Sequence, residues 1–104
     1  MPGSHYLLFS TLTTAGRRTF HQHPERLEEV NREIEQLGCK VGAQYALLGG
    51  YDFLTIVEAP DNATAAHLSV DLGARGTVNI TTLPAMSIAE FRKRLTGPKH
   101  LAHS

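Results

Sequence analysis

The sequence contains no tryptophan, only one cysteine and no long apolar run. An internal disulfide needs two cysteines, so the single Cys39 cannot form one within the chain. A lone thiol fits a reducing cytoplasm. No apolar run approaches the ~18 residues of a membrane span, and the N-terminus lacks the basic region and apolar stretch of a secretion signal. We therefore expect a cytoplasmic location and no membrane partner.

Net charge is also absent, because 10 basic residues balance 10 acidic ones. Nucleic-acid binding relies on a basic surface against phosphates, so we expect no nucleic-acid partner. The 41% hydrophobic content indicates a folded chain. At 104 residues it is expected to form a single domain over 1–104, with a core at about 5–95 and a flexible tail at 96–104.

The stretch 45–61 contains the clearest structural signals. Gly49-Gly50 between two apolar runs predicts a tight two-residue hairpin, because glycine adopts positive φ without a steric penalty. The second run ends before Pro60, which has no N–H for a sheet ladder. Asp61 is a favourable N-cap for a following helix. The stretch therefore predicts strand, turn, strand and helix start.

Periodicity extends this pattern along the chain. It predicts a short helical turn near 14–20, strands at 5–12, 39–48, 52–58 and 77–83, and helices at 24–37, 62–75 and 88–95. Gly38 is expected to end the helix at 24–37. Ser87 is expected to cap the last helix, which has Ile88, Phe91 and Leu95 on one side. The order βαββαβ plus a C-terminal helix is the ferredoxin-like α+β fold, with a four-stranded antiparallel sheet and its helices on one face. In that topology the first and third strands are central, and those two are apolar on both faces.

The face of the sheet without helices is then expected to be apolar. Monomers rarely leave a large apolar patch in water. We therefore predict a homodimer in which two sheets pack face to face, with a higher oligomer possible.

Several short motifs carry a family resemblance from about residue 6 to 95. They are Thr13-Thr14-Ala15-Gly16, Pro24-Glu25-Arg26-Leu27, Gly50-Tyr51-Asp52, Glu58-Ala59-Pro60-Asp61 and Pro84-Ala85-Met86. In order and spacing the chain resembles the GYD-domain family, although Cys39 stands where a glycine is more typical. The resemblance implies a dimeric α/β-barrel, a superfold that hosts cofactor-free mono-oxygenases, dye-peroxidase-like enzymes and ligand-sensing modules. Fold-level kinship alone assigns no activity.

Two acidic residues and a tyrosine are candidates for chemistry. Asp52, beside Tyr51 after the turn, would act as a base or ligand contact, or would satisfy backbone N–H groups while Tyr51 packs on a neighbour. The second interpretation is favoured. Glu58 shares a predicted strand face with apolar residues and would be either a buried site carboxylate or a solvated group near the strand end.

The remaining candidates are two tyrosines and a histidine. Tyr6 and Tyr45 are expected to line one space between sheet and helices, as core or as ligand contacts. His67 lies mid-helix and is titratable near neutrality. Histidines at 21, 23, 100 and 103 provide no ordered third ligand, so we expect no metal and no other cofactor.

Two functions follow from these patterns. The favoured one is a homo-oligomeric module that binds a small ligand or serves as an assembly scaffold. The alternative is a cofactor-independent mono-oxygenase- or isomerase-like enzyme, with Asp52, Glu58 or His67 as base and a tyrosine as hydrogen-bond donor.

Overall fold

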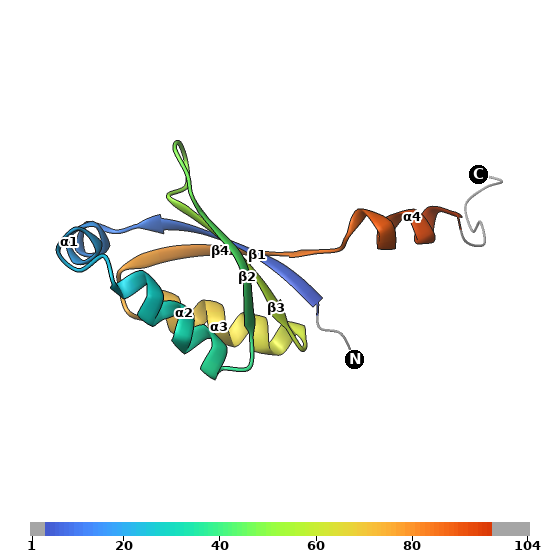
Figure 1. The fold of residues 1–104 in the computed structure, drawn as a ribbon, viewed down its shortest axis with the longest axis horizontal. Coiled ribbons are helices and arrows are strands. Elements are labelled where there is room, and N and C mark those ends of the chain that lie inside the picture. Colours follow the sequence, from blue (N-terminus) through green and yellow to red (C-terminus); the bar gives the residue numbers. More distant parts are fainter. Residues whose placement is uncertain (1–3, 97–104) are drawn as a thin grey trace.

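The computed structural model describes residues 4–96, which form one four-stranded antiparallel sheet with helices against it (Figure 1). The strand order is β2-β3-β1-β4, so the first and third strands are central. The α+β, ferredoxin-like prediction is confirmed. In chain order the elements are β1 (Ser4–Leu12), α1 (Thr14–Gln22), α2 (Arg26–Gln36), β2 (Lys40–Ala46), β3 (Phe53–Ala59), α3 (Asn62–Ala74), β4 (Val78–Ala85) and α4 (Ile88–Thr96).

Helices α2 and α3 cover one face of the sheet, and the core lies between these layers (Figure 1). Leu8 of β1 and Val57 of β3 point into it and are 2% and 0% exposed. Ile34 of α2 and Leu68 of α3 close it from the helix side. Each fully buried side chain of this size contributes about 1.5–3 kcal/mol relative to an exposed one.

The helix ends follow the signals in the sequence. Thr13 caps α1, since its Oγ1 accepts from the N–H of Gly16 at 3.0 Å. Asp61 caps α3 by accepting from the N–H of Thr64 at 2.7 Å. Gly38 follows α2 with φ of +90°, a conformation that favours glycine.

The connection between β2 and β3 is longer than predicted. The strands end at Ala46 and begin at Phe53, so the link is residues 47–52 and not a two-residue turn. Asp52 is hydrogen-bonded on both sides: its carbonyl accepts from the Leu47 N–H at 2.8 Å, and its N–H donates to the Ser10 carbonyl of β1 at 2.8 Å. Of the two central glycines, only Gly49 has positive φ, at +120°.

A register shift in β2 changes which side chains share a face. Strict alternation predicts Val41, Ala43 and Tyr45 on one side. The pairing with β3 shifts between Val41 and Ala43, as a β-bulge does. Val41 therefore shares the helix-covered face with Val57, while Ala43 and Tyr45 turn to the opposite face.

The last strand and helix also differ from expectation. Strand β4 runs through Pro84 to Ala85 instead of stopping at Leu83, which an edge strand tolerates. Helix α4 is capped by Ser87, whose Oγ accepts from the Glu90 N–H at 3.0 Å, as predicted. It extends away from the sheet and buries none of its residues (Figure 1). The predicted tail beyond Thr96 lies outside the described residues.

Candidate functional site: the open face of the sheet

The face of the sheet opposite α2 and α3 is apolar at its centre. Two rows of residues cross it, Ala43–Ile56–Leu7–Leu83 and Tyr45–Leu54–Phe9–Thr81. None of the helices within residues 4–96 lies over these rows (Figure 1). We call these eight residues the open face. On it Leu83 is 45% and Tyr45 is 55% exposed, while the central-strand members are half-buried.

Tyr51 extends the open face from the β2–β3 connection. Its ring lies 4.9 Å from that of Phe9, centroid to centroid, with the planes tilted by 44°. Such aromatic pairs contribute about 0.5–1.5 kcal/mol beyond their buried area. Tyr51 thus packs on Phe9, which agrees with the favoured interpretation of this residue. Its exposed fraction is 40%.

Asp52 is hydrogen-bonded to the backbone of β1. One carboxylate oxygen accepts from the Leu12 N–H at 2.7 Å, and the Asp52 N–H donates to the Ser10 carbonyl. These bonds hold the long connection against the central strand. The carboxylate therefore already accepts a backbone hydrogen bond, whereas a general base would need its oxygen within reach of a substrate proton.

Glu58 lies at the other end of β3, on the same side of the sheet as the open face. It pairs across the sheet with His5 on β1 and with Lys40 on β2. It lies six positions after Asp52, which at ~3.3 Å per residue places the two residues about 20 Å apart. Glu58 belongs to a polar rim with His5 and Lys40, and it does not meet Asp52.

Tyr6 and His67 lie elsewhere. Tyr6 is 3% exposed, faces the helices and donates its hydroxyl to Oδ1 of Asn62. The expectation that Tyr6 and Tyr45 line one space is wrong, because the bulge in β2 turns Tyr45 to the open face. His67 projects from α3 with its Nε2 3.1 Å from Oδ2 of Asp71, and its side chain is 62% exposed.

The remaining reactive side chains do not form a centre. No cluster of three His, Cys, Asp or Glu residues suited to a metal ion occurs between residues 4 and 96. His23 contacts Glu25 at 3.3 Å, and His100 and His103 lie outside the described residues. Cys39 is buried, and this burial raises the pKa of its thiol. Within the same range no helix has the length and apolar character needed to cross a membrane.

Sequence reasoning did not anticipate that α4 lies away from the body. Ile88, Phe91 and Leu95 form one stripe at helical spacing, and they are 72%, 47% and 55% exposed. Periodicity identified this stripe but assigned it no location. Met86, just before the helix, is 57% exposed and extends the apolar surface. We call these four residues the arm stripe.

Comparison with known proteins identifies the family. A curated protein of Thermus thermophilus is 46% identical over 91 residues, covering 86% of this chain and 96% of the relative. It is named "Glutamine synthetase and cystathionine beta-lyase binding protein". The model of the GYD domain matches residues 6–95, nearly the full length. The chain therefore belongs to the GYD domain family.

Proposed function

We propose that this protein is a non-enzymatic binding module that pairs with a second copy through the open face and binds an enzyme through α4. The observation that carries the proposal is the uncovered apolar centre of the sheet. At ~25 cal/mol per Å², each 100 Å² of that surface buried would contribute about 2.5 kcal/mol before the costs of association. A twofold partner supplies the same two apolar rows in return.

The polar rim favours the same arrangement. Lys40, Glu58 and His5 lie at one end of the open face, so they would border a sheet-on-sheet contact without entering its centre. Protein interfaces commonly have an apolar core and a polar rim. The candidate bases, by contrast, are separated or already hydrogen-bonded. The mono-oxygenase or isomerase alternative has no convergent site among the described residues to support it.

The enzyme partner is inferred from the relative's name and from α4. Helix α4 extends away from the sheet, so it would lie outside a contact between two packed sheets (Figure 1). Three cations, Arg92, Lys93 and Arg94, and one anion, Glu90, surround the stripe and leave the helix with a net charge of +2. A partner surface with an apolar groove and acidic borders fits this helix. We therefore propose that glutamine synthetase or cystathionine beta-lyase presents such a surface.

The test is co-sedimentation of the purified protein with each of these two enzymes from its own organism. We expect the wild type to co-sediment with one of them and Phe91→Ser to bind at least about tenfold more weakly, since aromatic anchors dominate interface energetics. Val70→Ser is the matched control, because Val70 is 68% exposed on α3 and away from the stripe. The proposal fails if neither enzyme is bound, or if Phe91→Ser binds as the wild type does.

A further inference from the structure

A cavity of about 60 Å³ lies between the covered face of the sheet and helix α2. A water needs roughly 10–15 Å³ by this measure, so the cavity has room for about four waters or a small organic group. Its wall is mainly apolar, with Phe20, Leu27, Val30, Phe53 and Leu72 among the lining residues. This site is separate from the open face and from α4, and it does not depend on the function proposed above.

The charged side chains that line the cavity are two arginines. Of the described residues that line it, only Arg26 and Arg75 are charged. Arg26 begins α2, and Arg75 follows α3, so the two guanidinium groups come from the two helices that cover the sheet. No carboxylate is part of the described lining itself, although each arginine is paired with a glutamate that does not line the cavity.

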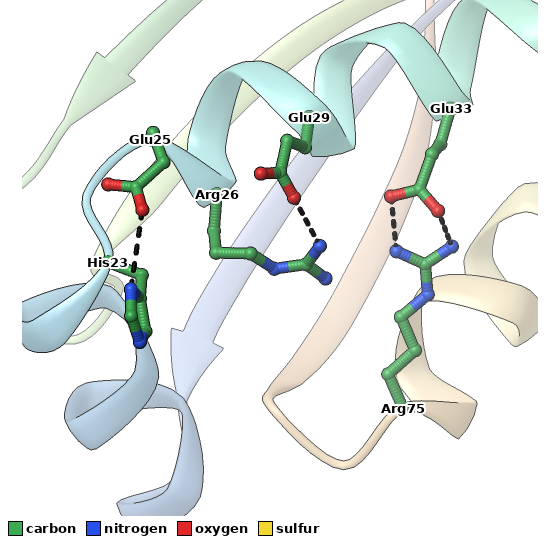
Figure 2. Close-up of polar contacts among 6 residues, drawn as sticks. All are labelled: His23, Glu25, Arg26, Glu29, Glu33 and Arg75. Atoms are coloured by element: carbon green, nitrogen blue, oxygen red, sulfur yellow. Dashed lines mark hydrogen bonds and ion pairs between the residues drawn. The ribbon is translucent and has the colours of Figure 1, made fainter.

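Two glutamates hold these arginines in place (Figure 2). Glu33 accepts from both terminal nitrogens of Arg75 at 2.7 Å, and Glu29 accepts from Nη1 of Arg26 at 2.6 Å. Glu29 and Glu33 lie at i+3 and i+7 from Arg26, so all three side chains leave the same side of α2. The arginine bond lowers the pKa of Glu33, which keeps that pair charged near neutral pH.

The arginines keep donors for a ligand. A guanidinium has five N–H donors. The glutamate bonds use two of those on Arg75 and one on Arg26. A planar carboxylate suits such a donor pair, because arginine binds it through parallel N–H···O bonds. With both arginines already partly neutralised, a single negative charge suits the site better than a phosphate dianion.

We propose that this cavity binds a small monocarboxylate, with its apolar body against Val30, Phe53 and Leu72 and its carboxylate at Arg26 and Arg75. The size limits the buried body to about four or five carbon atoms. Gln44 completes the wall: its Nε2 donates to Oγ1 of Thr55 at 3.0 Å, and its amide bonds Asn31 of α2. A ligand there would contact both the sheet and the helix layer.

The test is an NMR titration of the full chain with sodium isovalerate at constant ionic strength. Its neutral isostere 3-methylbutanamide and inorganic phosphate are titrated in parallel. We expect saturable shifts with isovalerate at residues lining the cavity, and affinity at least about tenfold weaker for the amide and for phosphate, because the charged bidentate contact is lost or mismatched.

Variants decide where the ligand binds. Arg26→Gln and Val30→Phe, which remove a donor and fill the cavity, are each expected to weaken isovalerate binding at least about tenfold. Arg32→Gln is the matched control on the same helix, since Arg32 is exposed and does not line the cavity. The proposal is overturned if isovalerate gives no saturable shift up to about 50 mM. Its binding free energy would then be weaker than about 2 kcal/mol. It is also overturned if the amide binds equally well, or if Val30→Phe and Arg26→Gln both bind as the wild type does.

Discussion

The two faces of the sheet are built from alternating residues of the same strands, yet only one is closed by the chain itself. Leu8 and Val57 on the covered face are 2% and 0% exposed. Their neighbours Leu7 and Ile56, on the open face, are only half-buried. Both sets are equally apolar. Alternation therefore identifies the residues that share a face, but not the partner that covers it.

The largest expected effect lies on the covered face. Leu8→Ala should lower the free energy of unfolding by about 2–5 kcal/mol, because it leaves a cavity in a fully enclosed core. Urea denaturation followed by far-UV circular dichroism measures this loss. Thr81→Ala is a control on the open side, where an exposed edge-strand side chain is removed and a change within about 0.5 kcal/mol is expected. Equal losses for both variants would remove the distinction between the faces.

A second substitution tests how closely α1 approaches the end of the sheet. A Cβ at Gly16 would lie 1.9 Å from the carbonyl oxygen of Thr77, a backbone atom that cannot rotate away. Gly16→Ala should therefore destabilise the protein by about 1–3 kcal/mol or more.

The matched control for that substitution is Gly73→Ala in α3, where an added Cβ meets nothing within 4 Å. Alanine is the better helix former, so this variant should gain about 0.5–1 kcal/mol. Opposite signs for the two glycines in thermal unfolding support the geometry. A neutral Gly16→Ala contradicts it.

A third change separates the open face from the core. Ile56→Lys places a charge in the middle of a face that water reaches in the monomer, where the lysine stem can lie on apolar surface and its amine remain solvated. We expect the folded circular dichroism spectrum to persist while sedimentation shows loss of self-association. An unfolded variant would mean that Ile56 belongs to the core of the single chain.

The smallest effect is a pH dependence at the edge of the helix layer. The hydrogen bond from Arg75 lowers the pKa of Glu33 in the folded state below its ordinary value of 4.5. The stability from this pair is therefore fully present above about pH 4.5, and it is lost as the pH falls through the lowered folded pKa. Because the pair is partly exposed, the contribution is modest.

Denaturation between pH 3 and 7 on Glu33→Gln and Arg75→Gln measures this contribution. In each variant the free energy of unfolding should fall less steeply in acid than in the wild type. The double variant should have the same slope as the single variants. An unchanged acid slope in Glu33→Gln would contradict the role assigned to the pair.

Sequence reasoning reached the fold because its signals are local. These signals each depend only on neighbouring residues. The structure contains the helix caps at Asp61 and Ser87 and the helix end at Gly38. The two-faced apolar pattern also placed the central strands correctly. These features need no knowledge of distant contacts.

The site was less predictable because it depends on long-range contacts. Strict alternation misses the bulge at Val41/Ala43, which moves Tyr45 to the open face. The bond from the Leu12 N–H to the Asp52 carboxylate joins residues 40 positions apart. The pairing of Arg75 with Glu33 also joins two helices far apart in the chain. None of these contacts has a signature in the local sequence.

The most direct test of the account is sedimentation equilibrium of the wild-type protein at micromolar concentration, with Ile56→Lys run beside it. One chain has a mass of 11.4 kDa. If the open face is covered by a second copy, the wild type sediments with at least twice that mass and Ile56→Lys with the mass of one chain. A wild type that sediments as a single chain would contradict the claim that this face is an interface.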